Sequence, residues 1–231
     1  GFDVDNNGKI VIADPNNNKI TVFDKDKVFE FKYRYGPLKV SFVSPTEVII
    51  HQMLEPIFSS SVRKIDYVKN TVTDYQNILN KDSFGDKTFG VLPFLRGDLL
   101  RYKTNYSVYT SKVLNFVVVF NNKGEIYRVF KMLDDDFDLR QISIEKFSNK
   151  KVYTLSSIEG DKLFVCKNII KKGKKSKVVD VFSISLGDYL YSFNLDFINN
   201  LWAVQFSDNK MYAIKENTEI EVFDYEIVGL D

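Results

Sequence analysis

The side chain best suited to proton transfer or metal binding is His51, the only histidine in the chain. It ends the apolar run Val48–His51 and directly precedes a long segment, Gln52–Ser61. An imidazole titrates near neutral pH, so it can serve as a general base or as a metal ligand. A zinc site built from several histidines is excluded, and no nearby serine lies in a nucleophile elbow. Function and a simple polar cap at a strand end both stay open for this residue.

Carboxylates near the start of the chain fit the spacing of a calcium loop. Positions 1, 3, 5, 6 and 12 of such a loop would be Asp3, Asp5, Asn7, Gly8 and Asp14. That loop needs a helix on each side, and the Pro and Asn residues that follow it break helices. We therefore predict a β-turn at residues 5–8 and no metal site. The acidic run at residues 134–138 is interpreted as a solvated loop.

Two further features could carry chemistry. Lysines gather near one hairpin: Lys167, Lys171, Lys172, Lys174, Lys175 and Lys177. No aromatic residues alternate with them, as a groove for single-stranded nucleic acid would require, so we interpret them as a solvated tip. Cys166 is the only cysteine and lies in an apolar strand pattern, which indicates a buried thiol and excludes an intramolecular disulfide.

Composition bounds the remaining classes of function. The 231 residues carry a net charge of +1, so no overall field directs the chain to nucleic acid or to an anionic membrane. No run of 18 apolar residues indicates a transmembrane segment. The chain is 15% aromatic, which suits sheets packed on sheets. We expect a monomer without a cofactor, located outside the cell or in the cell envelope after removal of a signal segment.

Short strands separated by turn residues must position these groups. In the stretch from Phe2 to Tyr33, apolar residues alternate with polar ones, and Asn-Asn-Gly and Asp-Pro-Asn mark tight turns. Four strands follow one another in about 35 residues. The pattern returns 191 residues later, where Phe2 and Val4 become Phe193 and Leu195. A β-sandwich has no reason to repeat its turns in this way.

A four-stranded repeat of about forty residues predicts an all-β protein, a β-propeller of five or six four-stranded antiparallel blades in one domain. The blades are expected at residues 2–34, 38–78, 98–132, 140–185 and 189–227, with an insertion at 79–97. The first unit, from Asp5 to Asp24, resembles an NHL repeat and the six-bladed propellers of bacterial envelope proteins. Some similar propellers, the lactonases, hold a metal in a central channel. No residue here can be matched one by one to that site.

The binding site is predicted from the direction of the strands. Loops between second and third strands share one face of a propeller with the loops that link blades, which brings the segment 52–61 beside the segment 79–97. Both are long and apolar, as recognition surfaces often are. The lysine hairpin, taken to join a third to a fourth strand, is expected on the opposite face. The predicted binding residues, which Ile57 and Leu95 accompany, are His51, Met53, Leu54, Phe58, Phe84, Phe89, Phe94 and Arg96.

The leading hypothesis is a non-catalytic binding module that recognises a protein or a glycan through this top face. The alternative is a metal-dependent hydrolase or lactonase that acts in the central channel. A structural piece of a larger chain is the third hypothesis.

Overall fold

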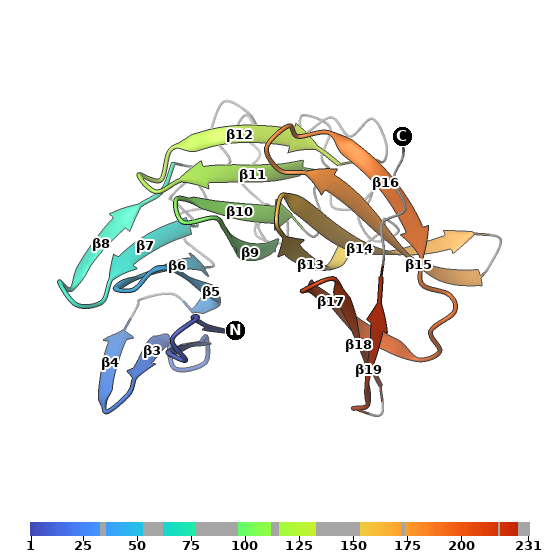
Figure 1. Cartoon of the computed structure of the whole chain (residues 1–231). Coiled ribbons are helices and arrows are strands. Elements are labelled where there is room, and N and C mark those ends of the chain that lie inside the picture. The colour runs from blue at the N-terminus through green and yellow to red at the C-terminus, as the bar shows by residue number, and fades with distance from the viewer. Residues whose placement is uncertain are drawn as a thin grey trace. The chain divides into compact units, whose positions relative to one another are not determined.

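The structure, a computed structural model, describes residues 1–32, 36–52, 62–76, 97–111, 116–132, 153–171, 174–216 and 218–225. These residues form nineteen strands in five antiparallel sheets (Figure 1). The described residues contain no helix, and so none with the length and apolarity that a membrane span would need. The all-β expectation is confirmed.

Each sheet is built from strands that are consecutive in sequence. The first contains Phe2–Val4 (β1), Ile10–Asp14 (β2), Lys19–Asp24 (β3) and Lys27–Lys32 (β4). The second contains Pro37–Ser44 (β5), Glu47–Gln52 (β6), Val62–Asp66 (β7) and Thr71–Asp74 (β8). The third contains Gly97–Tyr102 (β9), Tyr106–Ser111 (β10), Phe116–Asn121 (β11) and Ile126–Lys131 (β12). The fourth contains Tyr153–Glu159 (β13), Lys162–Lys171 (β14), Lys174–Ser183 (β15) and Tyr189–Asn194 (β16). The fifth contains Leu201–Ser207 (β17), Lys210–Lys215 (β18) and Ile220–Asp224 (β19).

Contacts divide the chain into two compact units, residues 1–148 and 149–231. The first unit holds three sheets and the second holds two. Such meanders are the blades of a β-propeller, the predicted fold class. The second and third sheets begin at Pro37 and Gly97, each one residue before the start of the blade expected there.

The boundary between the last two blades differs from the expectation. We expected Tyr189 to open the fifth blade, but the strand β16 pairs with β15 and completes the fourth sheet. The hairpin between β14 and β15 therefore joins the second strand of its sheet to the third, not the third to the fourth. The interpretation of this hairpin as a loop between a third and a fourth strand was wrong.

In the first unit, alternating strand residues form two apolar layers. One layer joins the first sheet to the second: Val11, Ala13, Ile20 and Val22 pack against Val40, Phe42, Val48, Ile50, Ile65 and Tyr67. The other joins the second sheet to the third: Ile49, Val62 and Tyr75 pack against Leu99, Tyr109, Val118 and Phe120. The middle strand β6 serves both layers, because consecutive residues point to opposite faces.

The second unit has one comparable layer, in which Phe164 of the fourth sheet stacks on Phe206 of the fifth at 4.2 Å between ring centroids. Cys166 is buried in the same layer, as predicted. Lys167 does not belong to a solvated tip. Its side chain is buried in an ion pair with Asp180, which also accepts a hydrogen bond from Ser192. A buried lysine needs such a partner, since an unpaired charge is strongly disfavoured there.

The turn predicted at residues 5–8 is present. The Asp5 carboxylate accepts hydrogen bonds from the backbone N–H groups of Asn7 (2.8 Å) and Lys9 (2.9 Å), and Gly8 has a φ of 77°. The Asp3 carboxylate accepts from Ser41 and from the backbone of Phe42, both at 2.8 Å. The carboxylates of this stretch thus bind donors of the protein itself.

Glycines in two turns offer a test of this packing. Both Gly8 (φ 77°) and Gly124 (φ 83°) adopt left-handed backbone conformations, but only at Gly124 would an added Cβ meet an atom, the ring of buried Tyr75. We expect Gly8→Ala to cost about 1 kcal/mol, from backbone strain alone. Gly124→Ala should cost about 2–4 kcal/mol, because overpacking is added to the strain. Urea denaturation of the two variants measures the difference, and equal losses would contradict the packing described for Tyr75.

Candidate functional site

His51 lies inside the contact between the second and third sheets. Its side chain is 1% exposed, and its ring centroid is 5.3 Å from that of Tyr109 on β10. Neither ring nitrogen has a hydrogen-bond partner among the described residues. Burial, together with a smaller effect of the positive charge of Lys39, lowers the pKa of His51 to about 4, although the negative charge of Asp98 opposes the change. The imidazole is therefore neutral at pH 7.

An ion pair next to His51 ties the two sheets together. The Lys39 ammonium lies 3.1 Å from the carboxylate of Asp98, which is nearly buried. Lys39 is the register partner of His51 on the neighbouring strand β5. Asp98 follows Gly97 at the start of β9, where an added Cβ would clash with the Tyr109 ring. The C-terminal end of β6 and the N-terminal end of β9 are thus held next to each other.

The same place is where the two apolar segments predicted to bind a partner begin or end. The chain leaves β6 at Gln52, one residue after His51, and enters β9 at Gly97. The Gln52 amide is also buried without a hydrogen-bond partner in the described part of the chain. Unpaired buried polar groups are rare and call for an explanation, such as a water, an ion or a role in function. Their presence at this junction marks it as the first candidate site.

The remaining predicted binding residues lie outside the described residues. They are Met53, Leu54, Phe58, Phe84, Phe89, Phe94 and Arg96, with Ile57 and Leu95. The structure therefore places one member of the predicted set, His51, and their joint surface stays a prediction.

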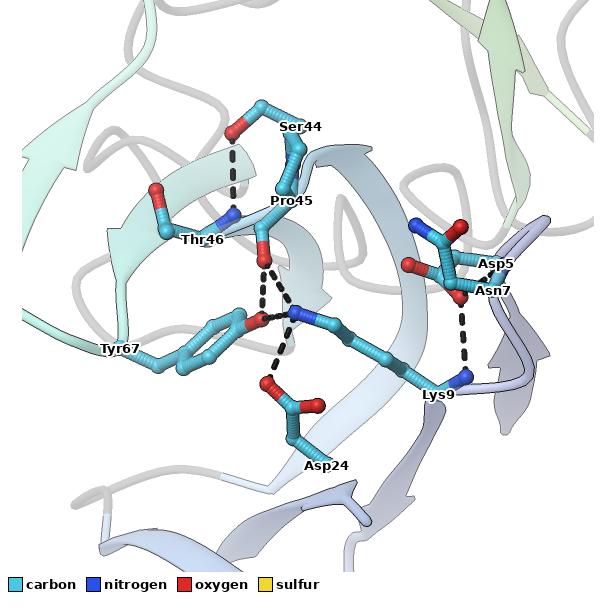
Figure 2. Close-up of polar contacts among 8 residues, drawn as sticks. All are labelled: Asp5, Asn7, Lys9, Asp24, Ser44, Pro45, Thr46 and Tyr67. Carbon is cyan, nitrogen blue, oxygen red and sulfur yellow. Dashed lines mark hydrogen bonds and ion pairs between the residues drawn. The ribbon is translucent and has the colours of Figure 1, made fainter. Parts of the chain in front are cut away.

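A second cluster lies at the other end of the first two sheets (Figure 2). The Lys9 ammonium is 2.8 Å from the Asp24 carboxylate and donates hydrogen bonds to the backbone oxygen of Pro45 (2.9 Å) and to the hydroxyl of Tyr67 (3.3 Å). The Tyr67 hydroxyl donates to the same Pro45 oxygen. Chiefly the hydrogen bond to Asp24 raises the pKa of Lys9, so its positive charge is fixed.

Beside this cluster is a depression of about 550 Å³. Its walls come from two turns of the first sheet, and its lining residues are Asn7, Lys9, Asp24, Lys25, Asp26 and Lys27. Every one of these side chains is polar or charged. This site was not predicted from the sequence, although the pairing of the hairpin strands contains a signal for it. Ile10 pairs with Phe23, so the next step along both strands places Lys9 opposite Asp24.

The open face of the first sheet is a third surface. It consists of side chains that are all at least 40% exposed: Phe2, Val4, Ile10, Ile12, Phe23 and Val28. They are register partners across the four strands, Phe2 with Ile12, Val4 with Ile10, Ile10 with Phe23 and Phe23 with Val28. This face thus carries six exposed apolar side chains beside the Lys19–Glu30 ion pair, and only the opposite face of the sheet is covered by the second sheet. In the described parts of the chain, no group of three His, Cys, Asp or Glu side chains could hold a metal ion.

Comparison with known proteins finds no matching family model and no matching curated protein. Solved structures do match. Hydrazine synthase of Kuenenia stuttgartiensis has a TM-score of 0.61 at 14% identity, over 92% of this chain and 54% of its own. An exported protein of Bacteroides fragilis, itself described as putative, has a TM-score of 0.59 at 13% identity, over 94% and 66%. Streptogramin B lyase has a TM-score of 0.55 at 14% identity, over 99% and 69%.

The chain has the β-propeller fold. It spans about half of the hydrazine synthase chain and just under two thirds of the exported protein. At these identities the likeness concerns the fold alone, and a propeller hosts many functions.

The depressed pKa of His51 predicts a dependence of stability on pH. Its pKa is 6.5 in an unfolded chain and about 4 in the folded one, so between these values the unfolded state binds more protons. The contribution of neutral His51 to the free energy of unfolding should be fully present above pH 6.5. It should be lost as the pH drops towards 4, by about 3 kcal/mol in total. Urea denaturation at several pH values measures this loss. In His51→Phe the part of the pH dependence due to this residue should vanish, and an unchanged pH profile would contradict the assignment.

Proposed function

We propose that the chain is a non-catalytic binding module that recognises a protein partner through apolar surface. The observation that carries this proposal is the open face of the first sheet. Monomeric proteins seldom expose large contiguous apolar patches, and such patches usually mark sites of interaction. Here the side chains are contiguous by register and span all four strands.

The other face of the same sheet indicates what kind of surface fits. Val11 and Val22 are fully buried there, against alternating aliphatic and aromatic residues of the second sheet. A partner that presents a similar flat layer of alternating apolar side chains would bury the open face in the same way. Burial of apolar area would then supply most of the affinity.

The junction at His51 supports a second contact. Long apolar segments leave the sheets there, and Phe58 and Phe94 within them are the aromatic residues that we expect to anchor a partner. Two partly independent contacts, one on a sheet face and one at the end of the sheets, suit a scaffold that holds a large partner. We place the module in the cell envelope or outside the cell, which the likeness to an exported protein supports.

The open face is tested with a double substitution. We expect Ile12→Ser with Phe23→Ser to weaken binding of a purified partner by a factor of about ten or more, since a tenfold loss corresponds to about 1.4 kcal/mol and central anchors of an interface exceed this value. A photo-crosslinking residue at position 23 identifies the partner, and titration calorimetry measures its dissociation constant.

The matched control is Tyr127→Ser with Val129→Ser, which removes two similarly exposed apolar side chains from β12 of the third sheet. Both double variants should retain the melting temperature of the parent chain within a few degrees, because they alter exposed side chains. Undiminished binding by the Ile12/Phe23 variant, or equal loss in the control, would overturn the role of the open face.

The junction is tested separately. Phe58→Ala with Phe94→Ala should weaken the same partner, while substitutions in the turn Asn121–Glu125, which joins a third strand to a fourth, should not. The lysine hairpin is unsuitable as a control, because it belongs to the same class of loop as residues 53–61. A partner that binds the Phe58/Phe94 variant normally would confine recognition to the open face.

A further inference from the structure

The depression beside Lys9 has a rigid floor. Lys9 is held by Asp24, Pro45 and Tyr67 together, which gives its three N–H donors three partners (Figure 2). The Asp5 carboxylate fixes the adjoining turn through the backbone N–H groups of Asn7 and Lys9. A ligand that enters the depression would meet a preorganised surface, which reduces the entropy that binding costs.

The lip of the depression carries polar groups that the protein does not use. Within the described residues, no hydrogen bond or ion pair engages the side chains of Asn7, Lys25, Asp26 or Lys27, whereas Lys9 and Asp24 neutralise each other. Two ammonium groups, one carboxylate and one amide are thus left for a ligand. Lys25 has a φ of 53°, so a lysine occupies a left-handed turn position that favours glycine or asparagine.

These free polar groups indicate which kind of ligand would fit the depression. Two free cations against one free carboxylate favour an anion of single charge. Two of the backbone N–H groups beside the depression, those of Asn7 and Lys9, are already bonded to Asp5 and are not available to cradle a phosphate. Asp26 accepts hydrogen bonds and the Asn7 amide both donates and accepts, which matches hydroxyl groups. No apolar side chain lines the depression, so a peptide would find no pocket for an anchor.

We propose that this depression binds an acidic sugar, with its carboxylate between Lys25 and Lys27 and its hydroxyl groups on Asn7 and Asp26. The volume of about 550 Å³ accommodates one or two sugar rings. The site is distinct from the open apolar face and does not depend on a protein partner. It would let the propeller attach to an acidic polysaccharide.

The test is titration of the intact chain with a disaccharide that contains glucuronic acid, followed by NMR shifts of the Asn7 side-chain amide. We expect saturable shifts, and no shifts with the methyl ester of the same disaccharide, which lacks the negative charge. Lys25→Ser with Lys27→Ser should weaken binding at least about tenfold. Asp26→Ala should weaken it less, because only hydroxyl contacts are lost.

The matched control is Lys123→Ser with Lys131→Ser, which changes the net charge equally at exposed lysines of the third sheet. It should bind as the parent chain does. Equal binding of the methyl ester, equal losses in both lysine variants, or tighter binding of a short glutamate peptide than of the disaccharide would each overturn the proposal. These outcomes do not involve the Ile12 and Phe23 positions, so they are independent of the proposed protein partner.

Discussion

The structure depends on one constraint, the alternation of side chains between the two faces of a strand. A four-stranded meander with apolar residues at both odd and even strand positions is apolar on both faces. It cannot bury either face by itself. In the first unit, β6 satisfies this demand on both sides, with Val48 and Ile50 towards the first sheet and Ile49 towards the third. Within the first unit, the first sheet satisfies this demand on one side only. An ordinary antiparallel sheet at the end of a stack would instead present a polar face to water.

Apolar layers hold the sheets together, but polar contacts between the sheets fix how they align. Asp3 bonds Ser41 and the backbone of Phe42 across the first pair of sheets, and Lys9 bonds Pro45 at the far end of the same pair. Lys39 and Asp98 join the second pair. Hydrophobic packing tolerates small slips, whereas a hydrogen bond fails beyond a few tenths of an ångström. Each of the two candidate sites in the first unit therefore contains a polar contact that joins two sheets, Lys9 to Pro45 at one and Lys39 to Asp98 at the other.

The sequence predicted those features that depend on neighbours along the chain. The alternation of side chains along a strand and the residues of a turn are local features, so the all-β propeller fold and the turn at Gly8 were predicted correctly. The burial of His51 was not predictable in the same way, because its partner Tyr109 lies 58 positions later and no pattern links the two. The pairing of Lys9 with Asp24 is intermediate in how far the sequence could predict it. Their pairing follows from the hairpin register, which the turn at Asp14 to Lys19 already implies.

The misplaced boundary at Tyr189 shows how a repeat in sequence can differ from a unit of structure. Phe193 matches Phe2 by the 191-residue shift, yet β1 pairs with β2 whereas β16 pairs with β15. The two stretches share the same turn residues. The partner of a strand, however, depends on which strand edge lies next to it.

One consequence is that the fifth sheet has three strands in the described residues, with β17 at its edge. An exposed edge strand offers unpaired backbone groups to any other strand. Here side chains of the fourth sheet meet that edge. Ser157 accepts a hydrogen bond from the backbone N–H of Phe206, and Glu159 accepts one from that of Asn209, just beyond the end of β17. The strand that the repeat would have supplied is thus replaced, at these two points, by polar side chains of the neighbouring blade.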